Sequence, residues 1–336
     1  MTQQSVRPLI SCVTENERDW FVKTQNLVLS LREFGGRLSS APVVAHFVDG
    51  VRPEFERALT RLDVEVRVVE PYGSRFRFSN KMRMFDLFAE RTDFDVLVAL
   101  DCDVLVMGDL TPFLTTEAVG IVPAGRDPFE LAQWPEIYEL FGAEVPEPNC
   151  IMRVSGEQTY PYYNTGVMTI PRAYGSRLCD RWVKVLESFG PVHERFPRVH
   201  HENQVAFAVA VAQEAIPITE LPVSLNLSTV VDVDRRFRDE LKLPFVIHYH
   251  QSIDEEGFVL ASATQSANGC IDDFNRFRAE LLGIHYSSLT RPPVLQRLQK
   301  TAATRSWYGG RTMRRFRKSA LGAAVKRVTA SGERKA

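Results

Sequence analysis

No stretch of this sequence is long and apolar enough for a membrane-spanning helix, which needs about 18 consecutive apolar residues. The first 20 residues also lack the extended apolar core of a secretory signal peptide. The composition, 44% hydrophobic and 25% charged over 336 residues, is ordinary for a folded globular chain. We therefore expect a protein that is made and retained in the cytoplasm.

Cysteine is scarce: the sequence has five, and no two of them form a C-x-x-C pair. An odd number of scattered cysteines argues against both a disulfide framework and a thiolate zinc site. Cys12 and Cys102 lie within apolar segments, so we expect them to be small core residues.

Positive charge is unevenly distributed, although the formal net charge is only −1. Residues 291–336 carry 13 lysines and arginines against one acidic residue, Glu333. We therefore predict a folded domain over 1–290 and a basic tail over 291–336. Residues 311–328 have the spacing of an amphipathic helix, which can lie on the anionic inner face of a membrane. A disordered basic tail is the alternative, and without a recognised motif nucleic acid is not an expected partner.

Short apolar segments alternate with amphipathic ones through much of the chain. The strands that we predict from β-branched and apolar runs are 9–15, 42–49, 64–70, 95–106, 162–171 and 245–250. The predicted helices are one that ends at Gly35-Gly36 and those at 53–62, 79–91, 172–189 and 201–213. This alternation implies βαβ units, so we predict an α/β fold, Rossmann-like, with a mostly parallel sheet flanked by helices.

The region 123–162 breaks this alternation because it is rich in prolines and aromatic residues. We expect a loop-rich insertion around a short helix at 129–142. Its Trp134 and Tyr138 could stack on an acceptor sugar, but packing in the core or in a lid is the simpler interpretation of two aromatic side chains at helical spacing.

Two carboxylates interrupt a strongly apolar run. Asp101 and Asp103 follow Val-Leu-Val-Ala-Leu at 96–100 and precede Val-Leu-Val at 104–106. Because an unpaired buried carboxylate is costly, either a cation lies between the two or the strand ends there in solvent. At the carboxyl end of a parallel strand both side chains reach the crevice where α/β proteins bind ligands. Mg²⁺ and Mn²⁺ accept such oxygen ligands and commonly bridge to a diphosphate.

The segment VLVALDCDVLVMGDLTPF at 96–113 resembles the D-x-D region of metal-dependent glycosyltransferases with the nucleotide-diphospho-sugar transferase (GT-A) fold. It is most similar to the glycogenin and lipopolysaccharide galactosyltransferase family. The resemblance implies that Asp101 and Asp103 bind a metal, usually Mn²⁺, with Mg²⁺ as the alternative. It also implies that Asp101 approaches the ribose of the nucleotide.

Two further segments match this family in its order along the chain. SNKMRMFDLF at 79–88 is similar to a family helix whose start carries a basic residue over the donor, which implies donor contacts for Lys81 and Arg83. YYNTGVMTIP at 162–171 resembles the family's F-N-S-G-V strand, whose asparagine faces the transferred sugar and corresponds to Asn164.

A late apolar segment, FVIHYHQ at 245–251, resembles the family strand whose histidine is the third metal ligand, which implies that role for His248. The family continues with glycine and then Lys-Pro-Trp, whose lysine meets the diphosphate. This sequence continues with SIDEEG instead. His250 and the basic residues around Lys81 are therefore the candidates to supply that positive charge to the donor.

Three more candidates come from weaker matches. HENQVAFAVA at 201–210 is loosely similar to the family's D-Q segment near the reacting carbon. Gln204 matches the glutamine and Glu202 adds a carboxylate, so both are catalytic candidates together with Asn164. Thr14, near the end of the first strand, is a candidate contact to the nucleobase.

The resemblance implies a glycosyltransferase that uses a nucleotide-sugar donor, with a UDP-sugar expected, and an unidentified glycan, lipid or protein acceptor. A divalent ion at Asp101, Asp103 and His248 would act as a Lewis acid on the diphosphate leaving group. An amide oxygen or carboxylate would stabilise the cation-like sugar carbon. A full resemblance also implies that the anomeric configuration is retained.

Two other functions fit a bare D-x-D motif. A haloacid-dehalogenase-like phosphohydrolase also has an apolar strand that ends in D-x-D. That motif normally lies near the amino terminus, however, and the late IDDF segment at 271–274 does not follow an apolar run. A catalytically silent nucleotide-sugar-binding module on the same fold is the other alternative.

Overall fold

The computed structural model describes residues 6–72, 77–197, 199, 201–233, 237 and 245–289. The chain divides into two units after Leu289, and every described residue belongs to the first unit. The predicted tail and its amphipathic helix at 311–328 lie outside the described residues, so both stay predictions.

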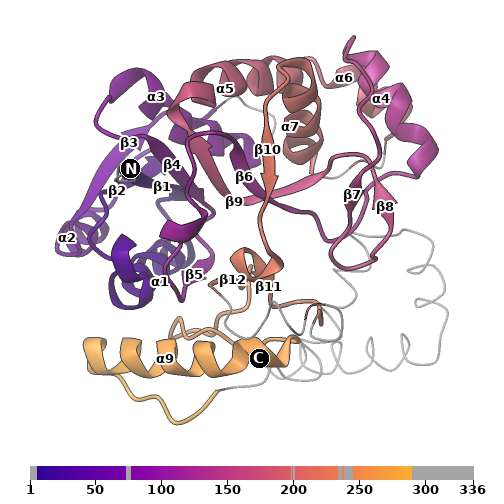
Figure 1. The fold of residues 1–336 in the computed structure, drawn as a ribbon. Coiled ribbons are helices and arrows are strands. Elements are labelled where there is room, and N and C mark those ends of the chain that lie inside the picture. Colours follow the sequence, from indigo (N-terminus) through magenta and orange to yellow (C-terminus); the bar gives the residue numbers. More distant parts are fainter. Residues whose placement is uncertain are drawn as a thin grey trace, which may run out of the picture. The chain divides into compact units, whose positions relative to one another are not determined.

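A seven-stranded sheet lies at the centre of the described part, in the order β10-β6-β9-β4-β1-β2-β3 (Figure 1). Its strands are β1 (Pro8–Glu15), β2 (Val43–Val48), β3 (Val64–Val69), β4 (Val96–Leu100), β6 (Val119–Pro123), β9 (Tyr163–Pro171) and β10 (Ile218–Glu220). All neighbouring strands are parallel except β9, which runs antiparallel to both β4 and β6.

Helices cover both faces of this sheet (Figure 1). The longer ones are α1 (Arg18–Phe34), α2 (Pro53–Thr60), α5 (Arg172–Glu187) and α7 (Glu202–Gln213). Because successive strand residues point to opposite faces, β4 contributes Leu97 to the core under α5 and α7 and Val98 to the core over α1 and α2. Burial on both faces explains why β4 reads as an uninterrupted apolar run. The predicted α/β fold class is therefore confirmed.

Two smaller sheets and several short helices complete the described residues. A three-stranded sheet contains β5 (Val104–Val106), β11 (Leu227–Ser228) and β12 (Val246–His248), and a two-stranded sheet contains β7 (Cys150–Ile151) and β8 (Gln158–Thr159). The remaining α-helices are α3 (Leu87–Glu90), α4 (Trp134–Leu140), α6 (Gly190–Arg195) and α9 (Asn268–Leu282). Short 3₁₀ helices are η1 (Gly36–Leu38), η2 (Arg77–Asp86), η3 (Thr111–Phe113), η4 (Leu131–Gln133), η5 (Val223–Leu225) and η7 (Gln265–Ala267).

Most predicted elements lie within a few residues of their observed bounds, and two predictions need correction. The strand predicted at 95–106 is two strands in different sheets, because the chain leaves the large sheet after Leu100 and β5 pairs with β12. The helix predicted at 79–91 is mostly the 3₁₀ helix η2, followed by the short α3. Ser79, the first residue of the predicted helix, lies inside η2, which begins at Arg77.

Cys12 and Cys102 are buried, as expected for small core residues. None of the helices in the described ranges combines the length and the hydropathy that crossing a bilayer would require.

Candidate active site

The break between β4 and β5 brings Asp103 and His248 together. In the antiparallel pairing of β5 with β12, His248 lies opposite Val104, and the Tyr249 N–H donates to the main-chain oxygen of Asp103 at 3.1 Å. The His248 side chain therefore lies beside that of Asp103, with 3.1 Å between Nε2 and Oδ1. Both side chains are largely buried, with exposed fractions of 6% for His248 and 15% for Asp103.

His250 completes a three-residue cluster that can hold a metal ion. It follows β12 with a positive φ of 55°, and its ring stacks on that of His248 with 4.0 Å between the ring centroids. One ligand atom from each of Asp103, His248 and His250 lies within 4.8 Å of the others. A carboxylate oxygen and two imidazole nitrogens suit a transition-metal ion better than Mg²⁺, which prefers oxygen ligands.

A chain of amide groups fixes the orientation of the His248 ring. The Gly166 N–H donates to Oδ1 of Asn164 at 2.8 Å, and this main-chain donor leaves no doubt which atom of Asn164 is the oxygen. Asn226 therefore presents Nδ2 to the same oxygen, at 3.0 Å, and its Oδ1 faces Nδ1 of His248 at 3.0 Å. It follows that Nδ1 of His248 carries a proton and that Nε2 is the nitrogen that faces Asp103.

The charges of this cluster reinforce one another. Burial by itself lowers the pKa of His248, but the Asp103 carboxylate outweighs burial and raises it. Burial opposes ionisation of Asp103, yet His248 and His250 hold the pKa of that carboxyl well below its usual range. Burial and the neighbouring His248 lower the pKa of His250 to about 3. His250 is therefore neutral near pH 7 and can offer a lone pair to a metal ion.

Asp101 does not join this cluster but pairs with Lys81. The Lys81 ammonium lies 2.8 Å from Oδ1 of Asp101 and also donates to the main-chain oxygen of Thr165 at 3.0 Å. Lys81 is buried, and its predicted contact with the donor stays a prediction. The metal-ligand and ribose roles of Asp101 stay predictions.

An irregularity in the sheet presents the residues that follow Asn164. The β6–β9 register shifts between Ile121 and Val122, and the main-chain oxygen of Gly166 accepts from the Asp101 N–H at 2.8 Å. A Cβ on Gly166 would lie 2.7 Å from Cε1 of His248, so only glycine allows this close approach. Bulges of this kind commonly re-aim side chains beside active sites.

Asn203, which lies between the two catalytic candidates of α7 in the sequence, links that helix to Lys81 through Thr165. Nε2 of His193 lies 2.9 Å from Oε1 of Glu202, so Glu202 links α7 to α6. Gln204 is half-buried. Asn203 donates to Oγ1 of Thr165 at 3.1 Å, and Thr165 is in turn a partner of Lys81. The catalytic roles of Glu202 and Gln204 stay predictions.

Two predicted donor contacts have other partners in the structure. Arg83 donates to the main-chain oxygen of Glu70 at 2.8 Å and lies over the ring of Tyr72, and no described contact joins it to Asp101. Thr14 is buried, and its hydroxyl donates to the main-chain oxygen of Trp20 at 3.2 Å. Their contacts to a nucleotide stay predictions.

The aromatic residues of the insertion are packed inside the protein. Trp134 and Tyr138 are both fully buried, and Nε1 of Trp134 donates to the carboxylate of Asp127. Packing, rather than stacking on an acceptor sugar, is therefore the interpretation that the structure supports.

Sequence reasoning missed two polar residues that the structure places around the predicted ones. They are Lys23 and Asn226. Asn226 has no motif around it, and only the three-dimensional pairing reveals its contact with His248. Lys23 did leave a signal, because it lies four residues before Leu27 and therefore on the buried face of the predicted helix.

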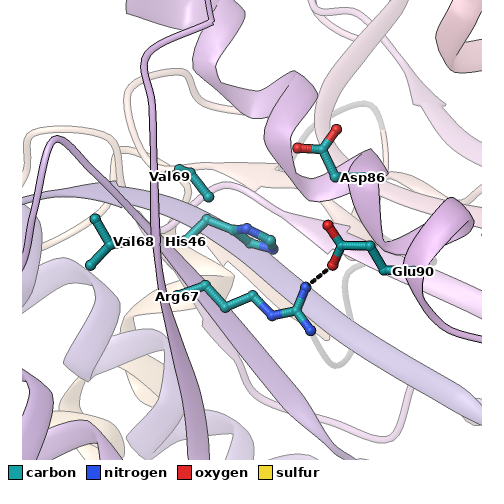
Figure 2. Close-up of a pocket in the computed structure, with 6 residues that line it drawn as sticks. All are labelled: His46, Arg67, Val68, Val69, Asp86 and Glu90. Atoms are coloured by element: carbon teal, nitrogen blue, oxygen red, sulfur yellow. Dashed lines mark hydrogen bonds and ion pairs between the residues drawn. The ribbon is translucent and has the colours of Figure 1, made fainter.

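A separate cavity of about 290 Å³ lies between β2, β3 and the η2–α3 segment (Figure 2). It is lined by His46, Arg67, Val68, Val69, Asp86 and Glu90. Figure 2 shows Arg67 in an ion pair with Glu90 beside the ring of His46. None of the predicted site residues lines this cavity.

Comparison with known proteins identifies one family. Residues 12–214 match the Rhodobacterales glycosyltransferase domain, which covers more than half of the chain. No curated protein matches this sequence.

Three solved structures illustrate the fold similarity. The glycosyltransferase GlyE of Streptococcus pneumoniae TIGR4 is 16% identical, with 84% of this chain and 66% of that chain covered and a TM-score of 0.49. The bifunctional glycosyltransferase WbbM is 13% identical, with 81% and 50% covered and a TM-score of 0.49. The galactosyltransferase LgtC, in complex with donor and acceptor sugar analogs, is 14% identical, with 83% and 97% covered and a TM-score of 0.47. This chain thus spans less than two thirds of the GlyE and WbbM chains.

Proposed function

The chain belongs to the Rhodobacterales glycosyltransferase domain family, and we propose that it transfers a sugar from a UDP-sugar with the help of a divalent ion. Sugar transfer follows from the family itself. The donor, the metal and the roles of single residues are the proposed part. The cluster of Asp103, His248 and His250 is the main support for these proposals. In the sequence, only Cys102 separates Asp103 from Asp101, which pairs with Lys81.

Asp103 and His248 are the proposed core of the metal site. Asp101 contributes the carboxylate oxygen that Lys81 does not hold, and His250 is a further ligand. The two imidazoles favour Mn²⁺ over Mg²⁺. When bound, such an ion supplies Lewis-acid stabilisation of the negative charge that builds on the diphosphate leaving group.

The remaining residues hold this arrangement in place before the donor arrives. Asn164 and Asn226 keep Nε2 of His248 directed at Asp103, so little reorganisation is needed during the reaction. Lys81 neutralises Asp101 and ties it to Thr165. Gln204 and Glu202 are the proposed groups beside the cation-like sugar carbon, with retention of configuration as the proposed outcome.

A thermal-shift screen of nucleotide-sugars with and without MnCl₂ tests this function. We expect a UDP-sugar to raise the melting temperature only when Mn²⁺ is present, and slow Mn²⁺-dependent hydrolysis of the same donor to release UDP. Asp103→Asn should lose the metal-dependent shift, whereas Asp93→Asn, which changes an exposed carboxylate, should keep it. Donor binding without turnover would support a silent binding module, and metal-dependent cleavage of an aryl phosphate would support a phosphohydrolase.

We also propose that residues 291–336 attach the protein to an anionic membrane surface on the cytoplasmic side. The support is their composition of 13 basic residues and one acidic residue. The full chain should co-sediment with vesicles that contain anionic lipid, less so at high salt, and not with neutral vesicles. Equal binding to both kinds of vesicle would contradict this proposal.

A further inference from the structure

A lysine is buried beside the proposed metal site. Lys23 lies near the start of α1 and is only 1% exposed. Its ammonium donates to Oε1 of Gln251 at 2.7 Å and lies 4.5 Å from the centre of the Trp20 ring. Both partners are neutral, so neither cancels its positive charge.

The start of α1 packs against the chain that follows β12. Besides the Lys23–Gln251 bond, the Tyr249 hydroxyl lies 3.4 Å from the main-chain oxygen of Lys23. Tyr249 and Gln251 flank His250, and the Tyr249 N–H donates to the main chain of Asp103. The Lys23 charge is also close enough to contribute to the lowered pKa values of Asp103 and His250.

A buried ammonium with only neutral contacts is costly. An ammonium group offers three donors, and within the described part of the chain Lys23 uses one in a hydrogen bond and forms no ion pair. Removing such a charge from water costs several kcal/mol unless an anion compensates it. The nearby Asp103 carboxylate balances this charge without touching it, and two of the three ammonium donors are left for an anion that a ligand brings.

The charges around the site indicate which anion this is. The carboxylates of Asp101 and Asp103 are balanced by the two nearby ammonium groups of Lys81 and Lys23. Adding a divalent cation between neutral histidines leaves two uncompensated positive charges. The diphosphate of a nucleotide-sugar carries two negative charges, so a bound donor restores the balance.

We infer that Lys23 binds the diphosphate of the donor and of the nucleoside diphosphate product, with Gln251 holding its ammonium in place beforehand. This inference rests on the proposed function. It places Lys23 beside the diphosphate leaving group. A charge-assisted hydrogen bond there becomes stronger as negative charge builds on the diphosphate. The alternative is a purely structural role, in which Lys23 only ties α1 to Gln251.

Binding measurements with ligands that differ only in the diphosphate separate these roles. In the presence of Mn²⁺, UDP is titrated by calorimetry and uridine by ligand-observed NMR against the full chain. Lys23→Met should weaken UDP binding by about tenfold to a hundredfold and change uridine binding less than about twofold. Lys23→Gln, which keeps the hydrogen-bonding capacity without the charge, should behave in the same way, and Lys23→Arg should restore most of the loss. Lys184→Met, at an exposed position of α5, is the matched control.

Two results would overturn the inference. One is an equal loss of UDP and uridine binding in both Lys23→Met and Lys23→Gln, which indicates a structural role. The other is unchanged UDP binding in either variant. Failure of the proposed function looks different: the wild-type chain would then bind no nucleoside diphosphate, UDP or GDP, in a Mn²⁺-dependent way, and the inference would fall with it.

Discussion

Nε2 of His248 lies 3.1 Å from Oδ1 of Asp103, although the two residues belong to segments far apart in the sequence. Nδ1 of the same ring faces Asn226, so the nitrogen directed at Asp103 is the one that takes up or loses a proton. A proton on Nε2 and the proposed metal ion would therefore compete for the same Asp103–His248 pair.

Manganese binding should weaken as the pH falls. Because Asp103 raises the pKa of His248, a larger fraction of the imidazole is protonated near neutral pH than in an unperturbed histidine. Metal must displace that proton, so the apparent affinity should fall by up to about tenfold per pH unit below the raised pKa. Calorimetry at pH 8 and pH 6 checks this, and an affinity that is independent of pH would contradict it.

The same pair predicts an opposite trend for the stability of the metal-free fold. A histidine whose pKa is raised by folding binds protons more tightly in the native state. Its contribution to stability is therefore fully present below the unfolded value of about 6.5 and is lost as the pH rises through the raised pKa. Urea denaturation of metal-free wild type and Asp103→Asn across this range should show the contribution only in the wild type.

Gly166→Ala should damage the proposed metal site without changing any of its proposed ligands. The new Cβ would lie 2.7 Å from Cε1 of His248 and 3.0 Å from Oδ1 of Asn164, so the ring and the amide that orients it must both move. Overpacking of this kind costs about 1–3 kcal/mol. We expect Mn²⁺ affinity to fall by about tenfold while the circular dichroism spectrum is kept.

Gly269→Ala is the matched control for this change. Gly269 lies at the start of α9, and a Cβ there meets nothing within 4 Å. Replacing glycine by alanine in a helix usually stabilises it by up to about 1 kcal/mol. If Gly166→Ala leaves Mn²⁺ affinity as unchanged as Gly269→Ala does, the contact of Gly166 with His248 is not part of the metal site.

Much of the fold was predictable because it is written in local patterns. The buried strand β4 is an uninterrupted apolar run, β2 is interrupted only by His46, and α1 ends just before Gly35, as its sequence indicates. The break in the strand after Leu100 could not be predicted, because Val-Leu-Val at 104–106 is as apolar as the run before it. Only pairing with β12, from a segment far along the chain, decides that these residues leave the large sheet.

Some residues of the candidate site could likewise be predicted from the sequence, and others could not. Asp103 and His248 carry residue types that point to metal binding, so a motif could predict them. Asn226 and Lys23 act through contacts with residues that are distant in the sequence, and neither has a motif of its own. Asp101 was predicted as a metal ligand, and its ion pair with Lys81 is a feature that the spacing of two aspartates cannot reveal.

Lys81→Met should destabilise the fold because it leaves a carboxylate and a carbonyl without their partner. Lys81 is 9% exposed and Asp101 is 30% exposed at the side chain, so the pair is only partly screened by solvent. Breaking a fully buried pair costs about 3–5 kcal/mol, and partial exposure of Asp101 reduces our expectation to about 2 kcal/mol. Urea denaturation measures this loss, with the exposed Lys184→Met as control. A loss no larger than that of the control would mean that the Lys81–Asp101 pair does not contribute to stability.

The buried His46 should make the free energy of unfolding fall at acid pH. His46 lines the cavity of Figure 2, and no residue of the candidate active site does. The ring is 1% exposed, and in the described structure neither of its nitrogens has a hydrogen-bond partner. Burial, with a smaller effect of Arg67, lowers its pKa to about 4. The unfolded chain therefore binds a proton that the native chain refuses between pH 6.5 and about 4, and stability falls as the pH drops through that window.

The size of this effect follows from the shift, at 1.36 kcal/mol per pKa unit, and is about 3 kcal/mol across the window. His46→Leu replaces the ring with an apolar side chain that cannot take up a proton. The free energy of unfolding, measured in urea at pH 6.5 and pH 4.5, should therefore fall more steeply for the wild type than for His46→Leu. Because the carboxylates titrate in both proteins, the difference between the two slopes isolates His46. Parallel slopes would show that His46 accepts its proton in the native state as readily as in the unfolded chain.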